Sequence, residues 1–275
     1  MHYKDRYTIG EVSKICNIST KALRYYDKIG LIHSERSHTN NYRVYAKESL
    51  LAVPVIKYYK QMGFTLDEMR DHIEGNSYRA IRYSFEKKIL ELRETQEATR
   101  RKFVSVRDWR DLLNEAEMVI DNDTREVSVK YVEASDYLFL DQAFENDIWD
   151  AIINIEFTNY VESVNNEITG PVMIRFSSYR DRMENTAQDM RIMQKTIIPC
   201  KDREKMIFGG EIMISCYHIG PHEDIAGTYE KIKRWASAND YVLGQEAYER
   251  YVTDYWTTRD SSKYVTEIML SASRG

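Results

Sequence analysis

Cysteine is scarce in this sequence. The 275 residues contain three, Cys16, Cys200 and Cys216, and no two of them form a CxxC pair. This spacing excludes a disulfide framework and provides no thiolate cluster for a metal or redox sensor. His218 and His222 have a spacing found in metal sites, but the Gly-Pro between them prevents the regular helix that would align both rings. We therefore expect no metal site and no other cofactor.

A long apolar segment is also absent. No run approaches the roughly 20 apolar residues that are needed to span a bilayer, and the N-terminus has no apolar signal core. These absences argue against a membrane protein and a secreted protein. We expect a soluble, cytoplasmic protein without a membrane partner.

The chain as a whole lacks the basic charge balance of a nucleic-acid-binding protein, because its net charge is −5. The charges are nevertheless distributed unevenly. Residues 1–60 hold eleven Lys and Arg against five Asp and Glu, a net charge of +6, whereas residues 61–275 hold twenty-eight against thirty-nine, a net charge of −11. A basic head on an acidic body indicates a DNA-binding module joined to a domain with another task.

Residues 8–45 carry the pattern of a helix-turn-helix. Thr8 is a suitable N-cap, and Glu11 completes a capping box with it. Asn17 ends this first helix, and Ser19 or the threonine after it caps a second one. Two short helices joined by a tight polar turn can place the second helix in a DNA major groove.

The segment after this helix pair predicts a small β-wing. Gly30 ends the second helix, and a turn signal at Asn40 and Asn41 precedes alternating aromatic and basic residues. This pattern would present Arg43 and Tyr45 to a phosphate backbone. Amphipathic helix pairs are also common in ordinary cores, so periodicity alone equally allows a solvated face with half-buried rings.

The actual residues favour DNA binding. ALRYYDKIGLI at 22–32, followed by NYRVY at 41–45, resembles the signature of the MerR family of transcription regulators. The resemblance implies that Arg24 and Tyr25 lie on the recognition helix and Arg43 on the wing, with double-stranded promoter DNA as the partner. The candidate DNA contacts are Thr8, Ser19, Lys21, Arg24, Tyr25, Tyr42, Arg43 and Tyr45.

Neither Pro nor Gly occurs between residues 78 and 115, and a heptad frame there predicts a coiled-coil seam. One core position holds Phe85, Leu92, Thr99, Val106 and Leu113, and the other holds Ile89, Gln96, Phe103 and Arg110. A coiled-coil dimerisation helix and a homodimer are expected, because a helix-turn-helix usually reads two half-sites with two subunits. The alternative is a long solvated helix that packs on its own domain.

After residue 120 the pattern becomes that of an α+β domain. The first passage comprises a strand at 126–133 with a neighbouring strand at 137–144, a helix at 147–164 and a strand from Pro171. The second comprises a strand at 211–218, a helix at 224–238 and strands at 246–253 and 264–271. Residues 179–205 have no readable pattern and would contain the missing strand. The sequence thus predicts a tandem of two strand–helix–strand–strand (βαββ) passages.

This order resembles the GyrI-like effector-binding domain of multidrug-sensing MerR regulators. The segments that carry the resemblance are YHIGPH at 217–222, AYERYVTDYW at 247–256 and YVTEIML at 264–270. The two resemblances together predict a multidomain chain. It comprises an all-α winged helix-turn-helix head at 1–76, a coiled-coil dimerisation helix at 77–120 and an α+β GyrI-like (tandem βαββ) effector domain at 121–275.

The candidate effector site is an aromatic pocket with acidic residues. Period-two alternation places Glu249 and Tyr251 on one strand face, and the family resemblance places pocket carboxylates at Glu249 and Glu267. An ionised carboxylate among rings favours lipophilic cations. Alternatively, Glu249 is an exposed strand residue paired with a Lys or Arg. The candidate ligand-binding residues are Tyr229, Glu249, Tyr251, Tyr255 and Glu267.

The resemblances imply a transcription activator that responds to a small molecule. Such a regulator distorts a promoter with an over-long spacer so that RNA polymerase can use it. Some GyrI-like domains hydrolyse small molecules, so the alternative is a hydrolase fused to a DNA-binding head. Because no nucleophile–base pair is visible at a useful spacing, we expect a sensor and not an enzyme.

Overall fold

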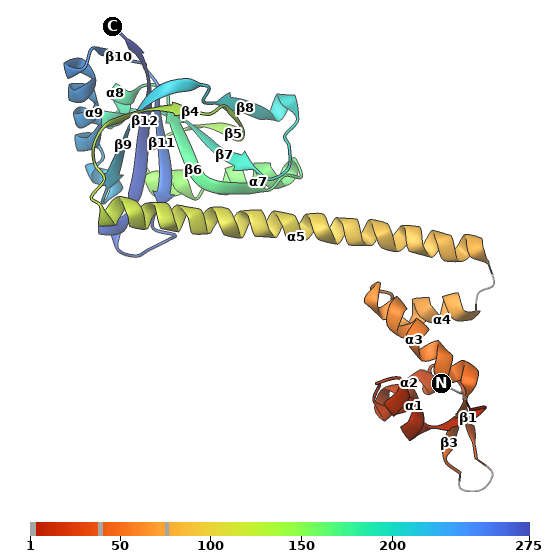
Figure 1. Cartoon of the computed structure of the whole chain (residues 1–275). Helices are drawn as coiled ribbons and strands as arrows, with labels where there is room; N and C mark the ends of the chain where they lie inside the picture. The colour runs from red at the N-terminus through yellow and green to blue at the C-terminus, as the bar shows by residue number, and fades with distance from the viewer. Residues whose placement is uncertain (1–3, 38–40, 75–76) are drawn as a thin grey trace. The chain divides into compact units, whose positions relative to one another are not determined.

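The computed structural model describes residues 4–37, 41–74 and 77–275. The chain forms two compact units, residues 1–97 and 98–275, each with its own hydrophobic core (Figure 1). Helix α5 (Tyr78–Asp121) runs without interruption across the division. The functional boundaries at 76/77 and 120/121 stay predictions, and the predicted turn residue Asn40 lies outside the described residues.

The first two helices of the N-terminal unit begin at the predicted caps. The hydroxyl of Thr8 accepts the N–H of Glu11 at 3.3 Å, and the Glu11 carboxylate accepts the N–H of Thr8 at 2.9 Å, which confirms the capping box. Ser19 caps the second helix by accepting the N–H of Ala22 at 3.1 Å. The elements before α5 are β1 (Arg6–Thr8), α1 (Ile9–Ile15), α2 (Thr20–Lys28), β2 (Ser34–Arg36), β3 (Arg43–Ala46), α3 (Lys47–Gln61) and α4 (Leu66–Glu74).

A three-stranded antiparallel sheet in the order β1-β3-β2 accompanies these helices. The prediction that the head is all-α is therefore wrong. Strand β3 pairs with β1 on one side, where Tyr7 lies opposite Tyr45, and with β2 on the other, where Glu35 lies opposite Val44. Apolar side chains from helices and sheet form one core, and each large one contributes roughly 1.5–3 kcal/mol by leaving water. Fully buried members of this core are Val12, Leu23, Tyr45, Val53, Ile56 and Met69.

Helix α5 changes its surroundings along its length. Near its start Phe85 packs on Phe64 and His72, with ring centroids 5.0 and 5.8 Å away. In its middle the predicted seam is open to solvent, and the side chains of Phe103 and Val106 are 64% and 70% exposed. Its last turns are buried again through Leu112, Ala116 and Val119. Although α5 is long, no helix among the described residues is apolar enough over its length to cross a membrane.

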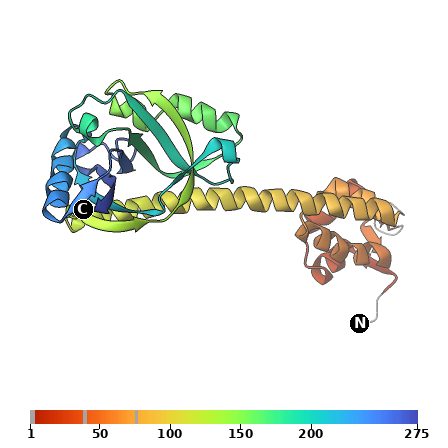
Figure 2. The ribbon, with the colours of Figure 1, turned by 90° about the horizontal axis from the view of Figure 1, so that it is seen from above.

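The C-terminal unit is built on one strongly curved nine-stranded sheet (Figure 1 and Figure 2). Its strands follow the order β4-β9-β12-β11-β6-β7-β5-β8, and β10 pairs with β12 off this path. The strands are β4 (Ser128–Val132), β5 (Ser135–Ala143), β6 (Ile168–Phe176), β7 (Asp189–Thr196), β8 (Lys205–Phe208), β9 (Glu211–Ile219), β10 (Tyr241–Leu243), β11 (Ala247–Thr253) and β12 (Val265–Arg274). The helices are α6 (Ile148–Ile152), α7 (Ile155–Ser163), α8 (Tyr179–Met183) and α9 (Ala226–Ala238).

The sheet contains two passages in a pseudo-symmetric arrangement. The order β9-β12-β11 in one half is repeated in reverse as β6-β7-β5 in the other, so that β11 and β6 meet at the centre. Strand β7 is the element that was hidden in the unreadable region. Two local predictions are wrong: β4 pairs with β9 and not with β5, and the helix predicted at 147–164 is broken because Asn154 caps a separate α7.

The two faces of the sheet carry different cores. Helices α6 and α7 cover one half of one face, and α9 covers the other half (Figure 1). The opposite face carries a cluster rich in methionine and aromatic rings, which are polarisable and adaptable side chains. Its buried members are Tyr137, Met173, Met193, Phe208, Met213, Tyr248 and Met269. The surroundings of Glu249 on β11 and Glu267 on β12 therefore depend on the sheet face to which each side chain points.

Candidate functional site

The exposed side of α2 is the candidate DNA-reading surface. Leu23 and Tyr26 are buried in the head core, whereas Lys21, Arg24 and Tyr25 are exposed. The helix therefore presents two cations and an aromatic ring on its free side. Such side chains suit contacts with phosphates and base edges.

The other predicted DNA contacts differ in how freely they are placed. The hydroxyls of Thr8 and Ser19 are engaged as helix caps. Tyr42, just before β3, is 66% exposed. Arg43 Nε donates to Asp27 Oδ2 at 2.9 Å and is only partly exposed. Among these, Tyr42 has the largest exposed surface to offer DNA.

Tyr45 requires a correction. Its side chain has no exposed surface, and its hydroxyl is buried without a hydrogen-bond partner among the described residues. A ring in this position contributes apolar packing to the head core. The predicted contact between Tyr45 and a phosphate is therefore not compatible with this structure.

Glu249 lies at the centre of a buried polar cluster. It is 0% exposed, and Arg182 of α8 donates to its carboxylate from Nε at 2.9 Å and from Nη2 at 3.3 Å. The hydroxyl of Tyr229 donates at 2.7 Å, and the hydroxyl of Tyr251 also donates. The carboxylate is buried and paired, as a buried charge must be. The alternative of an exposed Glu249 is thus wrong in its exposure and right in its pairing with an arginine.

Glu249 and Glu267 do not share a site. In the register of β11 against β12, Arg250 lies opposite Glu267, and Glu249 lies opposite Ile268. Because successive strand residues point to opposite faces, Glu249 points to the helix-covered face and Glu267 to the other. The structure therefore brings Glu249 together with Tyr229 and Tyr251 and separates Glu267 from them.

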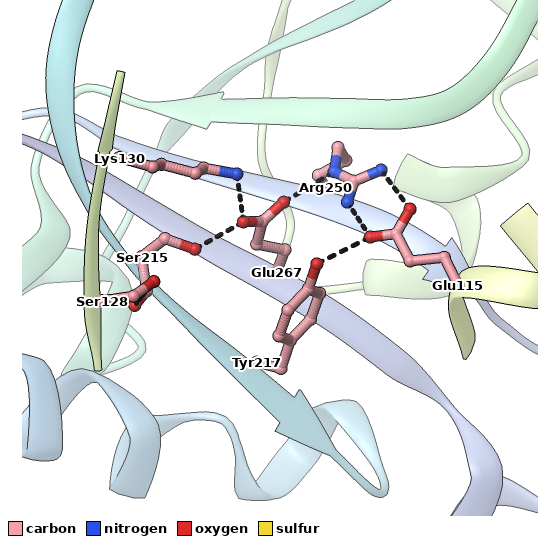
Figure 3. A network of polar contacts seen from close by, with 7 residues as sticks. All are labelled: Glu115, Ser128, Lys130, Ser215, Tyr217, Arg250 and Glu267. Carbon is pink, nitrogen blue, oxygen red and sulfur yellow. Dashed lines mark hydrogen bonds and ion pairs between the residues drawn. The ribbon is translucent and has the colours of Figure 1, made fainter. Parts of the chain in front are cut away.

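Glu267 belongs to a polar network on the opposite face, shown in Figure 3. Its carboxylate accepts hydrogen bonds from Lys130, Ser215 and Arg250, and the Arg250 Nε lies 2.8 Å away. Burial alone would favour the neutral acid, but the two cations outweigh it and hold the pKa of Glu267 below its usual value. Glu267 therefore serves as an ionised carboxylate that links side chains of neighbouring strands.

The same network reaches α5 (Figure 3). Arg250 Nη1 donates to Glu115 Oε2 at 3.1 Å, and Nη2 bonds the other carboxylate oxygen. The hydroxyl of Tyr217 donates to Glu115 Oε1 at 2.8 Å. Charge-assisted, two-point bonds of this kind have a defined geometry. They attach the last turns of α5 to the sheet.

A cavity of about 160 Å³ lies beside this part of α5. Trp109 and Leu112 of α5 line it, together with Tyr251, Asp254 and Trp256 at and after the end of β11. The apolar part of the remaining wall includes Ile152, Ile153, Phe157, Ile168 and Val172. An apolar cavity of about 150 Å³ is large enough for one benzene ring. This cavity is the candidate effector site.

Asp254 is the acidic residue of this cavity, and sequence reasoning missed it. It is 7% exposed, its Oδ1 accepts the N–H of Trp256 at 2.8 Å, and no Lys or Arg in the described part of the chain forms an ion pair with it. Burial raises the pKa of its carboxyl, and the backbone N–H groups offset only part of that effect. The sequence signal that could have identified Asp254 is its position three residues after Tyr251, which was a predicted ligand-binding residue.

Tyr255, the remaining candidate, contacts α6 beside the cavity. Its ring packs at a tilt of 31° against Trp149 with centroids 4.0 Å apart, and its hydroxyl donates to the Trp149 carbonyl at 2.8 Å. A larger hollow of about 550 Å³ also lies at α6, but its lining contains none of the predicted ligand residues. It is lined by the acidic side chains of Asp141, Glu145, Asp147, Asp150 and Glu156.

The two histidines are engaged in the fold. His218 bonds the Thr228 hydroxyl at 3.0 Å through Nδ1 and the Pro221 carbonyl at 2.8 Å through Nε2, so neither nitrogen is open to a metal. His222 stacks on Tyr264 with centroids 5.1 Å apart. Within residues 4–37, 41–74 and 77–275, no three His, Cys, Asp or Glu side chains are grouped to hold a metal ion.

Comparisons with known proteins match two separate parts of the chain. Residues 7–76 match the model of the MerR HTH family regulatory proteins, and residues 125–272 match the model of the GyrI-like small molecule binding domain. The multidrug-efflux transporter 2 regulator of Bacillus subtilis is 33% identical over 89 residues, which is 32% of this chain and 33% of that protein. The multidrug-efflux transporter 1 regulator of the same organism is 46% identical over 65 residues, which is 23% of each chain.

Two solved structures are similar at a low level. A cryo-EM structure of an EcmrR–DNA complex is 20% identical, with a TM-score of 0.46, and the match covers 98% of this chain and 100% of that one. A hydrolase from Listeria innocua is 12% identical, with a TM-score of 0.39, over 55% of this chain and 93% of that one. The chain spans a third or less of the length of the two Bacillus regulators. The matched models nevertheless cover most of the chain, which belongs to the GyrI-like family through residues 125–272 and carries a MerR-type helix-turn-helix domain at residues 7–76.

Proposed function

We propose that this protein is a ligand-responsive transcription regulator that binds promoter DNA as a homodimer. The observation that carries the proposal is the continuity of α5. Phe85 near its start packs into the head core, and Trp109 and Leu112 near its end line the effector cavity. A ligand that contacts the end of this continuous helix can change the orientation of the DNA-binding head that is attached to its start.

The head supplies the DNA-binding activity. Its net charge of +6 over residues 1–60 attracts the phosphate backbone. Lys21, Arg24 and Tyr25 on the free side of α2 enter the major groove, and the β2–β3 pair acts as the wing, with Tyr42 and Arg43 beside the adjacent backbone. The acidic remainder of the chain repels DNA and confines docking to the head.

Helix α5 supplies the dimer contact. Its exposed apolar residues recur at heptad spacing, and a second copy of the helix would remove them from water as a two-stranded coiled coil. The members exposed by 40% or more are Ile89, Leu92, Phe103, Val106 and Leu113. Two heads joined in this way read two half-sites, so the operator is an inverted repeat.

Ligand binding controls transcription by changing the geometry of the two bound heads. In the activating state they bend and untwist a promoter with an over-long spacer, which brings its elements into the register that RNA polymerase needs. The regulators of the Bacillus multidrug-efflux transporters resemble the head, which supports a gene for export or detoxification as the target.

A hydrolase joined to a DNA-binding head is the second candidate. Hydrolysis through a covalent intermediate needs a nucleophile and a base within hydrogen-bond reach. Among the described residues that line the cavity, the hydroxyl of Thr158 donates to the Asn154 carbonyl and that of Tyr251 to Glu249, and neither hydroxyl is paired with Asp254. This arrangement supports a sensor that reports occupancy.

Selection of DNA by the full-length protein tests the proposal. We expect a random duplex library to become enriched in an inverted repeat in the presence of the wild-type protein, and the Arg24→Ala variant to enrich none. A dimeric wild-type protein that enriches no sequence would contradict the proposed function.

A further inference from the structure

The charge of Glu249 is already neutralised inside the fold. Both of its carboxylate oxygens accept hydrogen bonds from Arg182, and Tyr229 and Tyr251 donate to them as well. With 0% exposure and four donors, this carboxylate has no free face for a ligand. An arriving cation would have to displace the arginine, which would leave a buried charge without a partner.

Asp254 is in the opposite situation. It lines the cavity, and its carboxyl accepts backbone N–H groups of Trp256, at 2.8 Å to Oδ1, and of Thr257, but no Lys or Arg among the described residues forms an ion pair with it. A carboxylate that is 7% exposed and not paired with a cation creates a negative potential in the space that it faces. Burial raises its pKa, in agreement with the missing cation.

The rest of the wall complements a cation with an apolar body. Trp109, Tyr251 and Trp256 bring three aromatic rings to the same cavity. Aromatic faces attract cations, and the exposed rings of Trp109 (40%) and Trp256 (69%) are accessible to one, whereas Tyr251 is buried. The volume of about 160 Å³ limits the part of the ligand that can be enclosed to about one ring with a small cationic group.

We propose that Asp254, and not Glu249, makes the effector cavity select small lipophilic cations, with an aromatic ring enclosed and an ammonium group against the Asp254 carboxylate. This inference rests on the proposed function, because it assigns the charge preference of the same cavity. It also places the ligand against Trp109, so that the bound cation touches α5 itself.

The test uses two compounds of the same shape, phenyltrimethylammonium and tert-butylbenzene, in which a charged nitrogen replaces a neutral carbon. Titration of the full-length protein is followed by tryptophan fluorescence, because Trp109 and Trp256 line the cavity. We expect the wild type to prefer the cation. Asp254→Asn keeps an acceptor for the Trp256 N–H, and it should weaken the cation roughly tenfold to a hundredfold without changing tert-butylbenzene affinity. Glu162→Gln, which removes an exposed carboxylate of α7, should change neither affinity.

Three results would overturn the role of Asp254. They are equal affinities of the wild type for both compounds, an unchanged cation affinity in Asp254→Asn, and an equal loss of both compounds in that variant, which would indicate a structural role. Equal affinities of the wild type for the two compounds would overturn the proposal even if the variant does not fold. DNA selection tests the proposed function separately: an enriched inverted repeat without cation preference would remove only the role of Asp254.

Discussion

Arg250 of β11 and Glu115 of α5 form a two-point ion pair that joins the sheet to the long helix. One of its bonds, Nη1 to Oε2, measures 3.1 Å, and both side chains are about one-fifth exposed. Arg250 is also held by Glu267 through Nε. The helix end that lines the effector cavity is therefore fixed to the sheet by a side chain whose own position is fixed.

Glu115→Gln should loosen this attachment without unfolding the protein. The variant loses one charge-assisted contact, worth about 1–3 kcal/mol, while Arg250 keeps its bond to Glu267. Amide hydrogen exchange should accelerate in residues 112–120, by roughly fivefold to a hundredfold if exchange follows local opening. Glu117→Gln is the matched control, since Glu117 is exposed on the same helix. Equal exchange in both variants would show that Arg250 does not fix the helix.

Arg24→Ala should abolish specific operator binding in a protein that remains folded and dimeric. Arg24 is exposed on α2, and the loss of its base or phosphate contact should cost roughly 1–3 kcal/mol per subunit. Gel-shift titration at fixed salt measures the change. Tyr45→Phe should leave operator affinity unchanged, because the removed hydroxyl is buried and has no partner among the described residues. An unchanged affinity of Arg24→Ala, or a weakened Tyr45→Phe, would contradict this assignment of the head surface.

Local signals were sufficient to predict most elements of the fold. The capping box at Thr8 and the strand alternation around Glu249 depend on neighbours within a few residues, and both are confirmed. The break at Asn154 was hidden because the apolar spacing continues across it. The pairing of β4 with β9 joins segments about 85 residues apart, which no local pattern specifies.

The candidate site was less predictable for the same reason. Arg182 neutralises Glu249 from a short helix in a region with no readable periodicity, 67 residues away. The separation of Glu249 from Glu267 follows from the register of two strands, and a shift by one residue would have placed them on one face. Charge and aromatic content thus indicated the kind of site, whereas its members depend on long-range pairing.

His222 should make the C-terminal unit less stable at acidic pH. Burial lowers its pKa to about 4, and the ring is 3% exposed. Between this value and the unfolded value of about 6.5, the unfolded chain binds a proton that the folded chain does not, so the free energy of unfolding falls as the pH falls. The loss from His222 between pH 7 and pH 5 should be about 2 kcal/mol.

Denaturant unfolding followed by tryptophan fluorescence measures this loss, since all four tryptophans lie in residues 98–275. His222→Phe keeps a ring beside Tyr264 and removes the titration. The difference between pH 7 and pH 5 should shrink by about the same 2 kcal/mol. The pKa of His218 is also lowered by burial, so part of the pH dependence should remain in the variant. An identical pH dependence in wild type and variant would exclude His222 as its source.

Phe103→Asp should convert the dimer into a monomer. Phe103 is 64% exposed in the single chain and occupies a core position of the predicted heptad seam. In a coiled coil this position is enclosed by four residues of the facing helix, and two carboxylates placed there would be buried close together without partners. Lys102→Asp introduces the same side chain one position away, outside the seam, and should leave the dimer intact. Sedimentation equilibrium at micromolar concentration distinguishes the two variants.

Because Phe103 packs in no core of the described chain, its replacement should not change the unfolding of either unit. An intact Phe103→Asp dimer would place the interface elsewhere, and a monomeric Lys102→Asp would show that the heptad frame is shifted.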